Sequence, residues 1–199
     1  MDSERIKIRI AGAGGHGVVL ASIILAEAAG VHDGKFVCQS QSYGPEARGG
    51  VCKAEIVISN GYIDYPKAKN LDVLMCYNQQ SLDEYFHNLK NRGILIVNSD
   101  YCTQVPITTG YEIPMATLSM EKTGMLQTMN VLSLGVLAAI TGIVSRRALK
   151  QAVSERVPKP FLEDNLKAFE AGFRAGSKAA ENAKKRKPAK FSRLILMDS

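Results

Sequence analysis

Six residues near the start of the chain, Gly12–Gly17 (GAGGHG), have the composition of a loop that holds an anion. They fit the pattern G-x-G-x-x-G and stand between a strand-like and a helix-like segment. Glycines there allow a tight turn and a close approach of backbone N–H groups to a ligand, and the following helix offers its positive N-terminal end. The pattern favours a phosphate-bearing or other polar ligand. Two bland alternatives stay open: the glycines serve only helix–strand packing, and His16 is a structural histidine.

A second glycine-rich loop follows the next strand-like segment, over Ser42–Gly50 (SYGPEARGG). Its Gly-Pro step favours a turn, and its final Gly-Gly step permits backbone conformations closed to other residues. In a parallel βαβ unit this loop leaves the sheet at the same carboxyl edge as the first one. Arg48 would then face a shared crevice, where a guanidinium suits phosphate or carboxylate, although a lone arginine is more often a surface residue. The candidate site residues are Gly12, Gly14, Gly15, His16, Gly17, Ser42, Tyr43, Gly44, Pro45, Glu46, Arg48, Gly49 and Gly50.

Other chemistry-bearing residues form no recognisable catalytic or metal-binding pattern in the sequence. The cysteines, Cys38, Cys52, Cys76 and Cys102, are far apart and include no Cys-x-x-Cys pair. Ligands of zinc and of Fe–S clusters usually come partly in short clusters, so we expect no metal on this chain alone. No Ser-His-Asp or paired-carboxylate arrangement stands out either. We therefore expect no catalytic residue and no cofactor held by this polypeptide alone.

Alternating strands and helices must position the two loops. Strands are expected at 5–11, 35–42, 51–59, 71–77, 93–98 and 108–113, and helices at 18–29 (ended by Gly30) and 79–91. The C-terminal third is predicted to be helical, over 128–143, 145–157 and 161–185. In the last of these helices, apolar and then small residues recur every three or four positions, which is typical of a closely packing amphipathic helix. The order favours an α/β class, a three-layer α/β/α Rossmann-like and mostly parallel sheet with a helical C-terminal third.

Composition is that of one ordinary globular domain. The chain has 199 residues, 46% of them hydrophobic and 22% charged, which excludes collagen-like, coiled-coil and wholly disordered classes. We predict one domain over 1–187 and a basic tail over 188–199. The apolar run 131–144 is too short to span a bilayer, so no membrane is expected. With no signal peptide, we expect a reduced cytoplasmic location.

The net charge of +6 and the pI of about 9.1 raise nucleic acid as a partner. Residues 178–199 hold seven basic and two acidic side chains, a net +5, so residues 1–177 carry only about +1. A basic run near a chain end is more often a solvated tail, and no aromatic–basic interleaving of the RNA-binding kind is present. We expect no nucleic-acid partner.

Several of these segments together resemble one family. They are Gly12–Gly17 after a strand, the Tyr-Gly-Pro-Glu-x-Arg-Gly-Gly segment at 43–50, the strand end Ile58-Ser59, the strand start 71–74 and the helix start Asn130 to Gly135. Over about residues 5–150 the sequence resembles the gamma subunit of 2-oxoacid:ferredoxin (acceptor) oxidoreductases, and segment 43–50 looks closest to the 2-oxoglutarate-type branch. The family often has Gln where this chain has His16.

The resemblance implies a non-cluster subunit of a larger enzyme that is inactive alone. Such complexes oxidatively decarboxylate a 2-oxoacid with coenzyme A (CoA) to an acyl-CoA and pass electrons to ferredoxin or a similar acceptor. Thiamine diphosphate and Fe–S clusters would lie on partner alpha, beta and ferredoxin-like subunits, and this chain would pack on the thiamine subunits and help form the CoA region. Once isolated, it would expose surface through which it can self-associate.

The alternative is a stand-alone Rossmann-type NAD(P)-dependent oxidoreductase. An NAD site should carry Asp or Glu at the end of the second strand to hold the ribose, and here that strand ends Gln39-Ser40-Gln41-Ser42. The missing carboxylate counts against this alternative.

Overall fold

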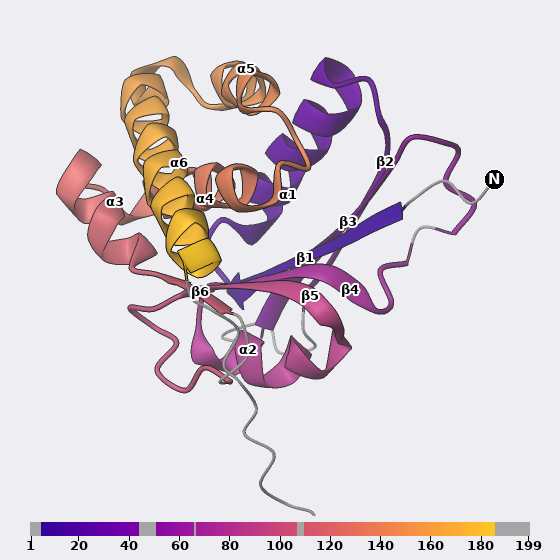
Figure 1. Ribbon diagram of the computed structural model, residues 1–199. Coiled ribbons are helices and arrows are strands. Elements are labelled where there is room, and N and C mark those ends of the chain that lie inside the picture. The colour runs from indigo at the N-terminus through magenta and orange to yellow at the C-terminus, as the bar shows by residue number, and fades with distance from the viewer. Residues whose placement is uncertain (1–4, 44–50, 66, 107–109, 186–199) are drawn as a thin grey trace, which may run out of the picture.

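A computed structural model describes residues 5–43, 51–65, 67–106 and 110–185. These residues form one twisted sheet with helices on both faces (Figure 1). The strands are β1 (Arg5–Ala13), β2 (Phe36–Tyr43), β3 (Val51–Ser59), β4 (Leu71–Cys76), β5 (Leu89–Asn98) and β6 (Gly110–Ile113). The helices are α1 (Val18–Glu27), α2 (Gln79–Tyr85), α3 (Met115–Thr123), α4 (Met129–Thr141), α5 (Arg146–Arg156) and α6 (Leu162–Lys185).

The sheet has the order β2-β3-β1-β4-β5-β6 and is mostly parallel, as predicted. Strands β1, β4, β5 and β6 run parallel to one another, whereas β3 is antiparallel to both of its neighbours. The expectation that the second loop belongs to a simple parallel βαβ unit is therefore corrected: β2 and β3 form a hairpin, and β3 lies between β2 and β1. Because β2 still runs parallel to β1, both strands end at the same edge of the sheet.

The two faces of the sheet are covered unequally. Helices α1, α3, α4, α5 and α6 lie over one face, and α2 lies over the other (Figure 1). Side chains of β1 alternate between them, so Ile8 and Ile10 join the larger core and Ala11 joins the smaller one. No helix of the described residues covers the α2 face of β2 and β3, and a polar cleft lies there.

Three element predictions required correction. The helix expected to end at Gly30 continues as a π-helical turn, Ala28–His32, and the left-handed glycine comes later, at Gly34. The helix expected over 79–91 ends at Tyr85, because residues from Leu89 onward join β5 and pair with β4. Helix α3 was not foreseen, since its buried side chains, Met115, Ala116 and Ser119, include one large apolar group and give little periodicity.

The C-terminal helices pack closely, as the small residues in the last helix predicted. Helix α6 crosses α4 where Gly172 faces the backbone of Leu132 and Gly135 faces that of Phe169. Among the described residues no helix is both long enough and apolar enough to cross a bilayer. The predicted tail, 188–199, lies outside the described residues, and the division into domain and tail stays a prediction.

Candidate functional site at the carboxyl edge of the sheet

The first glycine loop is a tight turn between β1 and α1. The His16 N–H donates to the Ala13 carbonyl (3.2 Å), and the Ala13 N–H donates back to His16 Nδ1 (3.3 Å). Gly15, the third residue of this turn, has φ +89°, a value that a type II turn requires there and that favours glycine. A Cβ at Gly14 would meet nothing within 4 Å, so the tip of the turn faces open space.

Gly17 joins this turn to α1 and is held from behind by α4. It has φ +72° and acts as the N-cap of α1. A Cβ at Gly17 would overlap the Asn130 carboxamide at the start of α4. No side chain caps α1 and its first turn has no acidic residue, so neither its cap nor its first turn compensates the positive end of the helix. An anion placed over the turn would find this charge available.

His16 is a neutral donor at the rim of the loop. Burial lowers the pKa of His16 below its usual 6.5. Because Nδ1 accepts the Ala13 N–H bond, the neutral ring carries its proton on Nε2. The ring lies parallel to that of Tyr101 at 6.4 Å between centroids and inclined to that of Tyr77, also at 6.4 Å. Tyr101 is 42% exposed, so its ring lies at the surface beside the glycine turn.

Buried polar residues support this edge from below. The Tyr77 hydroxyl bonds to Ser133 Oγ (2.6 Å), and the fully buried Asn98 side chain donates to the Tyr77 carbonyl (3.4 Å) and accepts from the Met115 N–H (3.0 Å). Burial raises the pKa of Tyr77, which keeps its hydroxyl protonated. Sequence reasoning missed these supports because Tyr77, Asn98 and Tyr101 belong to no motif. Their position at or just after the ends of β4 and β5 was the only available signal.

The second loop starts and ends at the same edge as the first, although not beside it. Tyr43 pairs with Cys52 of β3, and Val51 on the same strand pairs with Ala13 of β1. Two strand spacings, about 10 Å, therefore separate the ends of β1 and β2. Ser42 faces the cleft on the α2 side of the sheet. The remaining candidates of this loop, Gly44, Pro45, Glu46, Arg48, Gly49 and Gly50, lie outside the described residues.

This strand order differs from that of a dinucleotide-binding domain. There the second strand lies directly beside the first, which brings its terminal carboxylate to the ribose of a ligand on the glycine loop. Here β3 occupies that position. The arrangement adds a geometric reason, beside the missing acidic residue, against the stand-alone NAD(P)-dependent alternative.

The thiols near this edge are protected. Burial raises the pKa of Cys102 to about 12 and also raises the pKa values of Cys52 and Cys76. Thiols with raised pKa values are poor nucleophiles and poor metal ligands at neutral pH. Among the described residues, His, Cys, Asp and Glu side chains form no group of three or more that could hold a metal ion.

The fold and this edge define a class: an α/β protein whose glycine turn opens at the carboxyl ends of a mostly parallel sheet. The chain belongs to the pyruvate ferredoxin/flavodoxin oxidoreductase family, whose model matches residues 7–175. It is 40% identical over 182 residues to the 2-oxoglutarate synthase subunit KorC of Methanocaldococcus jannaschii, covering 87% of this chain and 97% of that one. It is 43% identical over 180 residues to KorC of Methanothermobacter thermautotrophicus, covering 86% and 95%.

Solved structures agree. The gamma subunit of a keto/oxoacid ferredoxin oxidoreductase from Geobacter sulfurreducens is similar with a TM-score of 0.81 and 40% identity, over 89% of this chain and 99% of that one. The 2-oxoglutarate:ferredoxin oxidoreductase of Magnetococcus marinus, solved with 2-oxoglutarate, coenzyme A and succinyl-CoA bound, contains the same fold at 20% identity and a TM-score of 0.79. This chain matches 32% of the length of that larger one. The predicted resemblance to the gamma-subunit family is confirmed.

Proposed function

We propose that this chain is the gamma subunit of a 2-oxoglutarate-type 2-oxoacid:ferredoxin oxidoreductase. The complex would convert 2-oxoglutarate and CoA to succinyl-CoA and CO₂, and the two electrons released would reduce ferredoxin or a similar acceptor. The observation that carries the proposal is the 40–43% identity to 2-oxoglutarate synthase KorC subunits. The aligned region covers 95–97% of the length of those subunits.

The glycine loop supports a role in the CoA region. CoA carries a pyrophosphate and a further phosphate, and the uncapped start of α1 beside Gly17 offers partial positive charge to such a group. The open tip at Gly14 and Gly15 leaves room for close approach, and His16 Nε2–H adds a donor. The proposed site comprises the loop Gly12–Gly17 together with residues Ser42–Gly50, and it leaves bond making to the partner subunits.

An apolar groove beside the glycine loop supports packing on another subunit. It has a volume of about 460 Å³ and reaches from Leu20 of α1 to Phe161 before α6. Asn130, which lines it, also contacts Gly17. Phe161, which is 50% exposed, and Leu20, which is 37% exposed, both line this groove, so the exposed apolar side chains are gathered in one place rather than scattered, as a subunit contact requires. The proposed partners are the thiamine diphosphate-binding alpha and beta subunits and a ferredoxin-like subunit or ferredoxin, which would also hold the Fe–S clusters.

Co-expression with thiamine- and cluster-bearing subunits tests the proposal. We expect a complex that co-purifies with this chain and reduces a viologen dye only when 2-oxoglutarate and CoA are both present. Pyruvate and 2-oxoisovalerate in place of 2-oxoglutarate establish the substrate preference. The same preparation without this chain, and this chain alone, serve as controls and should both be inactive. Failure of the chain to co-purify with any such subunit would refute the proposal.

A further inference from the structure

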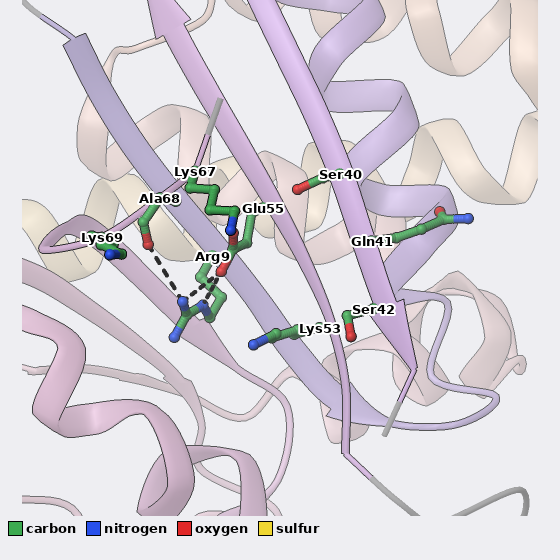
Figure 2. A pocket seen from close by; sticks show the side chains of 9 residues that line it. All are labelled: Arg9, Ser40, Gln41, Ser42, Lys53, Glu55, Lys67, Ala68 and Lys69. Carbon is green, nitrogen blue, oxygen red and sulfur yellow. Dashed lines mark hydrogen bonds and ion pairs between the residues drawn. The ribbon is translucent and has the colours of Figure 1, made fainter. Parts of the chain in front are cut away.

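A polar cleft of about 490 Å³ lies on the α2 face of the sheet, away from α1 and the glycine turn (Figure 2). Its volume falls within the range of small-molecule sites. The residues that line it are Arg9, Ser40, Gln41, Ser42, Lys53, Glu55, Lys67, Ala68 and Lys69.

The floor of the cleft follows from strand register. Arg9 of β1 pairs with Glu55 of β3, which pairs with Ser40 of β2, and the next polar row contains Lys53 and Ser42. Because alternate residues of a strand face the same side, both rows point into the cleft. Gln39 faces the other way and donates to Ser22 of α1 (2.9 Å).

Arg9 does not supply the free charge of the cleft. Its side chain is 7% exposed and forms an ion pair with Glu55 at 2.5 Å, so the two charges cancel. The guanidinium also bonds to Asn88 and to the Ala68 carbonyl (3.4 Å), and it lies 4.8 Å from the centre of the Tyr85 ring. Arg9 therefore fixes the segment around Ala68 against the sheet.

This attachment presents two lysines at the rim. The Lys69 N–H donates to the Lys67 carbonyl (3.1 Å), which closes a tight turn with Ala68 2% exposed at its centre. Lys67 and Lys69, on either side of Ala68, are exposed. Figure 2 shows Arg9 joined to both Glu55 and Ala68 beneath them.

Three lysine charges in the cleft have no carboxylate partner within the described part of the chain. Neither Lys53, Lys67 nor Lys69 forms an ion pair with any residue that the structure describes. Lys53 lies with its ammonium 5.2 Å from the centre of the Tyr85 ring, a cation–π contact that leaves its hydrogen-bond donors free. A net charge of +3 is thus gathered in one cleft of a body that carries about +1 over residues 1–177.

We propose that this lysine cleft, defined as Lys53, Lys67 and Lys69 with Ser40 and Ser42, binds a small molecule that carries at least two phosphate groups. Ammonium groups and hydroxyls are donors suited to phosphate oxygens, and three separated cations match a chain of phosphates better than a single carboxylate. Free pyrophosphate, a nucleoside diphosphate and CoA share this chemistry. The lysine cleft is separate from the glycine turn, because the two lie on different faces of the sheet, and the two proposed sites share only Ser42 at the end of β2.

Calorimetric titration of the full chain at low salt tests the proposal with sodium pyrophosphate, ADP, CoA and, as a dicarboxylate control, succinate. We expect pyrophosphate and ADP to bind and succinate not to bind. The double variant Lys67→Ala/Lys69→Ala and the single variant Lys53→Met should each weaken pyrophosphate binding about tenfold or more. Lys150→Ala, which removes an exposed lysine of α5, is the matched control and should bind as the unchanged chain does.

Each arm of the experiment has a decisive outcome. If ADP and CoA bind with equal affinity, the cleft recognises the phosphates that both molecules share. If CoA binds more tightly than ADP and the Lys67→Ala/Lys69→Ala variant loses this tighter binding, the cleft recognises CoA. Absence of pyrophosphate binding, or equal weakening by Lys150→Ala, overturns the proposal. If pyrophosphate does not bind and the lysine variants instead lose co-purification with partner subunits, the cleft binds an acidic protein surface and the proposal is wrong. Viologen reduction by the complex is scored separately, so either proposal can fail without the other.

Discussion

Two glycines of the same loop, Gly14 and Gly17, are constrained in different ways. Gly17 has a left-handed φ and faces the Asn130 side chain, whereas Gly14 has open space around its Cα and no such φ. The sequence identifies both glycines as parts of one motif but does not show that they are constrained differently. The difference comes from contact with α4, which lies more than a hundred residues further along the chain.

The substitutions Gly14→Ala and Gly17→Ala should therefore have opposite consequences. Gly17→Ala combines an unfavourable φ with overlap against Asn130 and should destabilise the chain by about 2 kcal/mol or more. Gly14→Ala should leave the urea unfolding midpoint of the chain unchanged and yet raise the Michaelis constant for CoA in the assembled complex, since the new methyl group projects into the open space over the turn where the ligand is proposed to bind. A Gly14→Ala complex with unchanged CoA kinetics and unchanged assembly would show that the turn tip contacts neither ligand nor subunit.

His16 should titrate below its ordinary pKa of 6.5, because burial disfavours the charged ring. The unfolded chain then binds the proton more readily than the folded one. The contribution of His16 to stability is therefore complete above pH 6.5 and is lost as the pH falls from 6.5 toward the lowered pKa. NMR titration should report this lowered pKa and an Nε2–H tautomer. Between about pH 7.5 and pH 5.5, the urea midpoint should fall less for His16→Gln than for the unchanged chain. A His16 pKa at or above 6.5 would contradict the structure.

At the scale of elements, the sequence predicted most strands and long helices because their periodicity is strong. It did not predict the place of β3. The alternation in 51–59 indicates a strand but carries no information on direction, and an antiparallel insertion next to β1 depends on the hairpin with β2. The small residues late in α6 did predict close packing, and the partner proved to be α4.

The crossing of α4 and α6 should tolerate no added methyl group. A Cβ at Gly172 would overlap the Leu132 carbonyl, and backbone atoms cannot move aside as a flexible side chain can. We expect Gly172→Ala to lower the free energy of unfolding by about 3 kcal/mol, at the upper end of the usual cost of overpacking. Arg174→Ala, an exposed position of the same helix, should change it by no more than about 0.5 kcal/mol. Equal urea midpoints for both variants would mean that the helices separate at little cost.

At the scale of the whole molecule, the two edges of the sheet are protected differently. Edge strand β6 is short and has α6 packed near it, whereas β2 is eight residues long and contains neither a charged residue nor proline. Charges and prolines are the usual means by which edge strands avoid pairing with other chains. Phe36, at the start of β2, is also 48% exposed. The sequence did not show that β2 is an edge strand, because an edge can be recognised only when the strand order of the sheet is known.

We therefore expect the isolated chain to self-associate as its concentration rises, through pairing of β2 edges. Sedimentation velocity over about 5–200 μM should show the association, and Phe36→Lys should reduce it by placing a charge on the edge. Tyr62→Lys removes an even more exposed aromatic side chain (77%) from a position outside the sheet and should leave association unchanged. An isolated chain that stays monomeric throughout, or equal effects of both variants, would exclude the β2 edge as the interface.

The position of β3 has a mechanical consequence. At the start of β3, Cys52 pairs with Gly12 of β1 on one side and with Tyr43 of β2 on the other, and Val51 pairs with Ala13 of β1. The last residues of β1 and of β2 are thus both joined to Cys52. Because one residue links the two strand ends, we expect a backbone displacement at the end of one strand to shift the end of the other as well.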